Sequence, residues 1–228
     1  MTVRRVEPEW LDVLPPDDPR ARRSRRELAR VNALMANAGI LARLVRTSAG
    51  AVPRTIAELG AGDGRFALRL ARALGTPPAG AVFTLVDRQA VVDPEAARGL
   101  AVLGWDLRPV QADALEWLAR PGENDAIVAN LFLHHLEAPA LARLLELASA
   151  RTRAFAACEP RRSAMAAAGS RLLALVGCGE VTRHDAAVSV RAGFNDRELS
   201  ALWPAGSRWI VEEGARGLFS HAFSARRA

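Results

Sequence analysis

The chain has 228 residues, half of them apolar and a quarter charged, with 31 basic and 25 acidic residues and a formal net charge of +6. This size and balance predict one globular domain with a substantial core and room for an added segment. Every basic residue is arginine, and the chain has neither lysine nor tyrosine. Together with the abundant alanine, this bias is typical of genome composition, so the moderate charge indicates an ordinary basic surface rather than a nucleic-acid-binding one.

The two cysteines and the start of the chain bear on where the protein works. Cys158 and Cys178 are too few for a disulfide framework or a zinc site. The first ten residues, MTVRRVEPEW, are charged and lack a hydrophobic signal region. No window reaches about 18 uninterrupted apolar residues, so no transmembrane helix is expected. These features predict a cytoplasmic protein without a membrane span.

The first 48 residues are predicted to be a helical segment. Residues 10–14 fit a short helix or an irregular arm. Asp18 and Pro19 form a good helix start, with the aspartate as N-cap and the proline in the first helical position. Apolar residues at helical spacing between Leu28 and Val45 predict two helices, broken near Asn37–Gly39.

Six arginines lie between Arg20 and Arg30. We interpret them as a solvated helix face, with two alternatives: a surface that meets an acidic substrate or partner, and an RNA-contacting face. The segment 1–48 is therefore expected to serve as a substrate cover or a dimer contact.

Residues 55–70, TIAELGAGDGRFALRL, organise the rest of the chain. An apolar run carrying Glu58 breaks into Gly60, Gly62 and Gly64 and then restarts with helical spacing. This order predicts a buried strand, a turn and a helix N-terminus that cradles a nucleotide-like ligand. Arg65 stands where a dinucleotide fingerprint needs its third glycine, and no phosphate-loop lysine follows. An acid before the turn repels phosphate and suits a cationic ligand with an amino group.

The string ELGAGDG resembles the first motif of class I S-adenosylmethionine-dependent methyltransferases, here of the small-molecule type. The resemblance runs from about Thr55 to Ser224. It implies an α/β fold with a doubly wound, seven-stranded, mostly parallel Rossmann-like sheet whose last strand is antiparallel. It implies S-adenosylmethionine as the cofactor, and it places the methyltransferase domain at 49–228 with a lid insertion at about 160–195.

Two later acids match the expected cofactor site. Asp87 ends the predicted strand 81–88, where both carboxylate oxygens can accept from the vicinal hydroxyls of a ribose. Asp113 follows the strand 106–110, where the family bonds the adenine amino group, and it can also cap the next helix. The cofactor-binding residues that the resemblance implies are Glu58, Gly60, Ala61, Gly62, Gly64, Asp87, Arg88, Asp113, Ala114 and Asn130.

The exit of the fourth strand, 124–132, bears on the acceptor. It reads Asn-Leu-Phe-Leu and lacks the two prolines that methyltransferases acting on base amines or glutamine share at this point. His134 and His135 follow, as they do in family members acting on small molecules and quinone-like compounds. Adjacent histidines cannot both face one way on a helix, so no metal site is predicted.

A second polar cluster is Arg183-His184-Asp185, in a predicted loop or helix cap. An imidazole can take a proton near neutrality, so His184 is the first candidate for a catalytic base and His135 the second. The alternative is a capping aspartate beside a surface histidine.

The end of the chain is predicted to alternate helices and strands. A helix at 195–202 has Asn195 or Asp196 as its cap. Strands at 207–213 and 217–224 form a hairpin joined by residues 214–217, and His221 lies on the last strand, either packed or exposed. The other elements are helices at 94–103, 139–150 and 163–177 and a strand at 153–159 that ends near the expected substrate mouth.

The hypothesis for function is methyl transfer to a small molecule, foremost to an oxygen of a phenolic, quinone-like or polyketide acceptor, by a monomer or homodimer that does not act on nucleic acid. One alternative is an RNA methyltransferase acting on ribose or carbon through the arginine-rich helix. The other is a non-enzymatic S-adenosylmethionine-binding protein.

Overall fold

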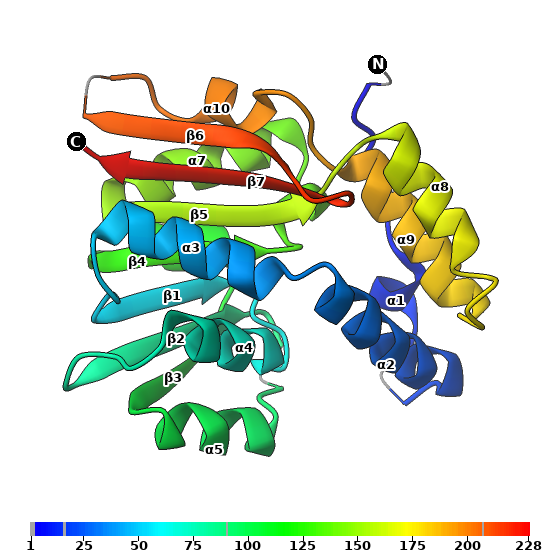
Figure 1. Ribbon diagram of the computed structural model, residues 1–228, viewed down its shortest axis with the longest axis horizontal. Coiled ribbons are helices and arrows are strands. Elements are labelled where there is room, and N and C mark those ends of the chain that lie inside the picture. Colours follow the sequence, from blue (N-terminus) through cyan, green and yellow to red (C-terminus); the bar gives the residue numbers. More distant parts are fainter. Residues whose placement is uncertain (1–2, 16, 90, 207) are drawn as a thin grey trace.

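The computed structural model describes residues 3–15, 17–89, 91–206 and 208–228. Its centre is one seven-stranded sheet with the strand order β3-β2-β1-β4-β5-β7-β6 (Figure 1). The strands from β3 to β5 are parallel to their neighbours, and β7 runs antiparallel to both β5 and β6. The predicted doubly wound sheet with an antiparallel last strand is therefore confirmed. The strands are β1 (Thr55–Leu59), β2 (Ala81–Asp87), β3 (Trp105–Gln111), β4 (Asn124–Asn130), β5 (Thr152–Pro160), β6 (Trp209–Arg216) and β7 (Ser220–Arg227).

Helices cover both faces of the sheet and one of its ends. In Figure 1, α3 and α4 cross the near face and α7 and α10 the far face, whereas α1, α2, α8 and α9 lie beyond the carboxyl ends of the parallel strands. The helices are α1 (Trp10–Val13), α2 (Pro19–Leu34), α3 (Asn37–Ala49), α4 (Arg65–Leu74), α5 (Pro94–Val102), α6 (Ala114–Ala119), α7 (Ala138–Arg151), α8 (Ala164–Leu172), α9 (Glu180–Ala192) and α10 (Glu198–Leu202), with a 3₁₀ turn, η1 (Leu133–His135).

Each face of the sheet has its own apolar core. Because side chains alternate along a strand, β1 sends Ile56 to one face and Leu59 to the other. Ile56 packs in the cluster that contains Leu41 of α3 and Leu70 of α4. Leu59 packs in the cluster that contains Leu144 of α7. With both faces buried, the strands read as apolar runs, which is why the sequence revealed them.

The first two long helices separate slightly earlier than predicted. Asp18 caps α2 as expected, accepting from the Arg20 amide at 2.7 Å. The break falls at residues 35–36 instead of Asn37–Gly39, and Ala36 takes the left-handed conformation there with φ of 55°. The glycine at position 39 lies inside α3, so the chain turns at an alanine and not at the glycine that suggested the break.

Two expectations near the end of the chain are wrong. Neither Asn195 nor Asp196 caps α10, which begins at Glu198. Asp196 has φ of 47°, outside the extended region that an N-cap residue uses. The Glu213 carboxylate caps this helix instead, accepting from the amides of residues 199 and 200 at 3.0 and 2.7 Å. Residues 214–216 belong to β6, so the hairpin turn lies at 217–219.

Within the described part of the chain, no single helix is long and apolar enough to cross a membrane. Only the bent pair formed by residues 19–32 and 37–49 meets the length and composition together, and its two helices are bent by 54°. The apolar residues of α3 are accounted for by the core, since Leu41, Leu44 and Val45 are buried in it.

Candidate active site

The glycine turn after β1 has the backbone shape that its sequence predicts. Gly60, Gly62 and Gly64 all have positive φ, at 68°, 53° and 76°, where other residues are strained. A Cβ on Gly60 would lie 2.3 Å from a ring carbon of Phe132, so only glycine fits beneath that ring. The amides of Gly60 and Ala61 donate to the Val86 carbonyl, which fixes the turn against the end of β2.

Asp87 reaches this turn from the tip of β2. Its Oδ2 accepts from the Gly62 amide and its Oδ1 from the Gln89 amide, each at 2.8 Å. The structure therefore brings together two of the predicted site residues, one from each strand end. Arg88, the next residue, is exposed and contributes its carbonyl to the Gln111 side chain at 3.2 Å.

Asp113 and Ala114 lie at the end of β3, beside β2. The Asp113 Oδ1 accepts from the amides of Leu115 and Glu116 at 2.8 and 3.4 Å, so the predicted capping role is confirmed. Ala114 is the buried first residue of α6. The Ala112 amide donates to the carbonyl of Asp87 at 2.9 Å, which joins this strand end to the previous one.

Glu58 is buried below the glycine turn. Its Oε2 has no hydrogen-bond partner among the described residues, and burial raises the pKa of the carboxyl well above its usual range. A buried carboxyl oxygen without a donor is costly, and an ammonium group is the partner that would offset this cost. This site therefore fits the amino group of the implied cofactor.

Asn130 ends β4 and is held from two other elements. Its Oδ1 accepts from the Asn37 side-chain amide at 2.9 Å, and the Asn37 Oδ1 accepts from the Ser220 hydroxyl at 2.7 Å. Leu131 follows with φ of 51°, which turns the chain sharply out of the sheet. The first residue of α3 and the start of β7 thus fix the exit of the fourth strand.

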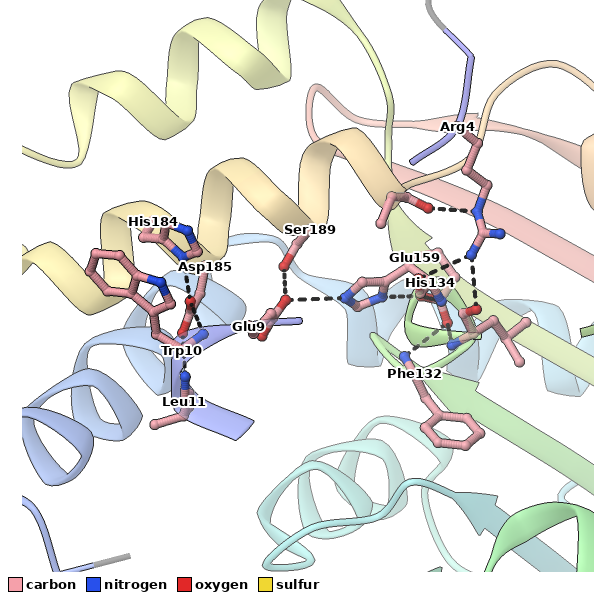
Figure 2. Close-up of polar contacts among 12 residues, drawn as sticks. Arg4, Glu9, Trp10, Leu11, Phe132, His134, Glu159, His184, Asp185 and Ser189 are labelled. Atoms are coloured by element: carbon pink, nitrogen blue, oxygen red, sulfur yellow. Dashed lines mark hydrogen bonds and ion pairs between the residues drawn. The ribbon is translucent and has the colours of Figure 1, made fainter. Parts of the chain in front are cut away.

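A second polar cluster surrounds His134 (Figure 2). The buried Glu159 of β5 accepts from the His134 Nδ1 at 2.8 Å and from the amides of Phe132 and Leu133 at 3.1 and 2.9 Å. The His134 Nε2 lies 3.6 Å from the Glu9 Oε1, and Ser189 also donates to that oxygen. Burial alone would lower the pKa of His134, but the hydrogen bond to Glu159 and the negative charge of the nearby Glu9 raise it to about 9.

His135 lies against His134, which corrects one expectation. The two rings have centroids 4.1 Å apart and planes tilted by 35°. The argument that adjacent histidines must face apart assumed an α-helix, whereas these two lie in the short 3₁₀ turn η1. Glu9 interacts electrostatically with both rings, and despite its burial these contacts and Ser189 lower the pKa of its carboxyl.

A cavity of about 580 Å³ opens beside this cluster. Helices α2, α8 and α9 form its walls, and Leu131 and Phe219 lie where it meets the sheet. Its lining is mostly apolar, and Glu9, His134 and His135 are the polar group on the wall nearest the end of β4. Leu131 lines the cavity while its neighbour Phe132 packs on Gly60, so the cavity adjoins the glycine turn.

Glu27 joins two walls of this cavity. Its carboxylate accepts from the Gly179 amide at 2.8 Å, from the Thr182 hydroxyl at 2.6 Å and from the Arg23 guanidinium at 2.6 Å. Partial burial would raise the pKa of Glu27, but these hydrogen bonds lower it to about 2. The carboxylate therefore ties α2 to the first turn of α9.

His184 lies apart from the cavity. The residues 183–185 form part of α9 and not the predicted loop or cap. The ring of His184 stacks on Trp10 with centroids 4.0 Å apart, and its Nδ1 lies 3.0 Å from the Asp185 Oδ1. The buried Asp185 caps α1, accepting from the amides of Trp10 and Leu11 at 2.8 and 3.1 Å. Among the described residues, His184 is not part of the cavity lining, and Figure 2 places it on the far side of Glu9 from His134.

Sequence reasoning missed Glu9 and Arg4. The Arg4 guanidinium donates to the carbonyls of His134 and Leu136 at 3.0 and 2.8 Å and to that of Ala192 at 2.8 Å. It thereby fastens the N-terminal segment over η1 and the end of α9. Both residues lie more than 120 positions before their partners, and the charged N-terminal string offered no local signal for these contacts.

Comparison with known proteins identifies the fold. Residues 56–154 match the family model described as a methyltransferase domain. The plantazolicin methyltransferase BpumL in complex with SAH is 13% identical, with 93% of this chain and 92% of that chain covered and a TM-score of 0.65. The plantazolicin methyltransferase BamL, in complex with a triazolic desmethylPZN analog and SAH, is 11% identical over 96% of this chain and 93% of that chain, with a TM-score of 0.67.

An O-methyltransferase family protein from Burkholderia thailandensis is 15% identical, with 93% of this chain and 63% of that chain covered and a TM-score of 0.57. A search of the curated proteins found no match. At these identities the solved structures establish a common fold. Residues 56–154 thus match a methyltransferase domain, and the chain as a whole shares the fold of methyltransferases whose structures contain SAH.

Proposed function

We propose that the protein transfers the methyl group of S-adenosylmethionine to an oxygen of a small, largely apolar acceptor bound in the 580 Å³ cavity. The observation that carries this proposal is the cavity's position. It begins at Leu131, one residue from the ring that packs on Gly60, so a molecule inside it lies beside the donor site. A phenolic, quinone-like or polyketide compound matches its apolar lining.

The donor site would be made by the ends of the first four strands. Glu58 would receive the cofactor's ammonium group and Asp87 its ribose hydroxyls, while Asp113 and the Ala114 amide would contact the adenine. The glycine turn lets the backbone approach without a Cβ in the way. Gly60, Ala61, Gly62, Gly64, Arg88 and Asn130 complete the proposed set.

When bound, the cofactor would supply a methyl group activated by its sulfonium sulfur: the acceptor oxygen's electron pair would form the new O–C bond, the C–S pair would stay on sulfur, and the hydroxyl proton would pass to a base on the cavity wall. The protein's share is alignment of the acceptor and exclusion of water. The segment 1–48 and the insertion 160–195 would provide that cover, since α2, α8 and α9 wall the cavity.

We assign the acceptor's proton to His135 in preference to His184. His135 lines the cavity, whereas the His184 ring is stacked on Trp10 and hydrogen-bonded to Asp185. A base must lie within hydrogen-bond reach of the proton it takes, so position decides between the two.

The test is a methylation screen over phenolic, quinone-precursor and polyketide acceptors, with release of S-adenosylhomocysteine as the readout. Against an active acceptor, His135→Gln should lower kcat by about 10²–10⁴-fold, the usual contribution of general acid–base catalysis. His184→Gln is the matched control and should stay close to the unmodified protein. Loss of turnover in the control with full activity in His135→Gln would reverse the assignment, and no methylation of any acceptor would refute the proposed class.

A further inference from the structure

Glu9, His134 and His135 bring three candidate metal-ligand atoms close together. A carboxylate oxygen and two imidazole nitrogens, one from each residue, all lie within 4.8 Å of one another. Two histidines and one glutamate form a ligand set that zinc uses in catalytic sites, with three protein ligands and one open position. The set joins the N-terminal segment to η1, so it exists only in the folded chain.

The surroundings of His134 have the form that metal-binding histidines need. Its Nδ1 is engaged at 2.8 Å by the buried Glu159, which leaves Nε2 as the nitrogen directed at Glu9. Such a carboxylate–histidine pair fixes the tautomer and the orientation of a ligating ring. Glu159 is itself held by the amides of Phe132 and Leu133, so the pair is rigid.

The spacing between two of these ligand atoms also suits an ion. The Nε2 of His134 lies 3.6 Å from the Glu9 Oε1, longer than a hydrogen bond. Two ligands about 2.0–2.2 Å from a tetrahedral ion are separated by about 3.4 Å. The two atoms therefore already stand near the separation of ligands that share one ion.

We propose that Glu9, His134 and His135 bind one divalent transition-metal ion of the zinc type, whose fourth coordination position opens into the 580 Å³ cavity. All three residues line that cavity, so a molecule inside it can reach the open position. Ion binding is independent of the proposed methyl transfer.

The ion's role toward the acceptor rests on the proposed function. A hydroxyl at the open position would lose its proton more readily, because a bound cation lowers the pKa of a coordinated oxygen. That proton would pass to water at the cavity mouth, and the oxygen would keep the electron pair for the new bond to carbon. With the ion bound, this route replaces direct proton transfer to His135, which then serves as a metal ligand; the base role assigned to His135 above applies to the chain without the ion.

The experiment uses the full chain, stripped of metal with a chelator and titrated with zinc sulfate by calorimetry. One ion per chain is expected to bind, and cobalt(II) should give the visible bands of a tetrahedral site. Glu9→Gln and His135→Asn should weaken zinc binding at least 10-fold, and Glu159→Gln about 10–100-fold, the usual cost of losing such a supporting carboxylate. His184→Asn, which removes an imidazole outside the cluster, should bind zinc like the unmodified chain.

The site is refuted if the unmodified chain binds no zinc, or if Glu9→Gln and His135→Asn bind it unchanged. The cobalt spectrum of the unmodified chain keeps the test valid where a variant fails to fold. If the unmodified chain with cobalt(II) shows no tetrahedral bands, that result alone contradicts the ligand set. Zinc binding without methylation of any acceptor would leave the site standing while the proposed function falls. Methylation that survives complete metal removal would overturn the ion's role in the reaction.

Discussion

Replacing Glu58 by glutamine tests whether its buried carboxyl holds the cofactor's amino group. The substitution keeps the size of the side chain and removes its ability to become negatively charged. A hydrogen bond to a charged partner contributes about 1.5–3 kcal/mol, so S-adenosylmethionine should bind about 10–150-fold more weakly to Glu58→Gln. The Oε2 of this residue has no other partner among the described residues, which ties the loss to the ligand.

The pH dependence gives a second, sharper readout. Burial raises the pKa of Glu58 well above 4.5 in the cofactor-free chain, so this carboxyl keeps its proton above the pH at which an unfolded chain would lose it. Pairing with an ammonium requires the ionised form, so cofactor binding should release a proton and tighten as pH rises toward the raised pKa. The folding stability of the cofactor-free protein should depend on pH in the opposite direction from cofactor affinity. The stability of the unmodified chain relative to Glu58→Gln should fall as pH rises above about 4.5.

The assay is calorimetry in several buffers of different ionisation enthalpy, which counts the protons released on binding. Release should occur in the unmodified chain and vanish in Glu58→Gln. Asp106→Asn, on the exposed part of β3, provides a carboxyl control. Equal cofactor affinity and equal proton release in the unmodified chain and in Glu58→Gln would refute the assignment of the ammonium to Glu58.

Three other predictions concern the turn, the N-terminal segment and the cavity wall. Gly60→Ala should lower the free energy of unfolding by about 1–3 kcal/mol and weaken cofactor binding, because its φ of 68° and the ring of Phe132 both exclude a Cβ; an unchanged urea midpoint would contradict this. Asp185→Asn weakens a buried cap and should cost about 1–3 kcal/mol, with amide exchange accelerated in residues 3–14 and unchanged in the sheet. Since the pKa of Glu27 is lowered to about 2, its stabilisation should be complete above pH 4.5 and fade as pH falls toward 2; a difference in Tm from Glu27→Gln that does not narrow over that range would show that the carboxylate is not held as described.

The sequence predicted the sheet, the shape of the glycine turn and the Asp113 cap because their signals are local. The glycines after β1 need positive φ within a few residues of the strand they end, and Asp113 caps the helix that directly follows it. Each of these positions can be read from its immediate neighbours. The mostly parallel sheet with an antiparallel last strand followed from the family resemblance, and the structure bears it out.

The cavity and the polar cluster around His134 could not be predicted in this way, because their contacts join distant parts of the chain. Glu9 meets His134 across 125 positions, and Glu213 replaces the expected cap of α10 from a strand that follows it. The cluster Arg183-His184-Asp185 looked like a cap, and Asp185 is one, but for α1 and not for its own helix. Which helix end a buried carboxylate serves depends on tertiary packing and leaves no periodic mark in the sequence.

The place of β7 in the sheet has a consequence for the order in which the chain folds on the ribosome. Among the described strands, β6 pairs only with β7, and β7 is synthesised after it. Until β7 emerges, β6 has no edge to join, and the outer edge of β5 stays open. Because β5 carries Glu159, the polar cluster around His134 should become rigid only when the β6–β7 hairpin docks. The glycine turn after β1 should form before that step. Pulse-labelling of stalled nascent chains would reveal two separate steps, with the donor side protected first.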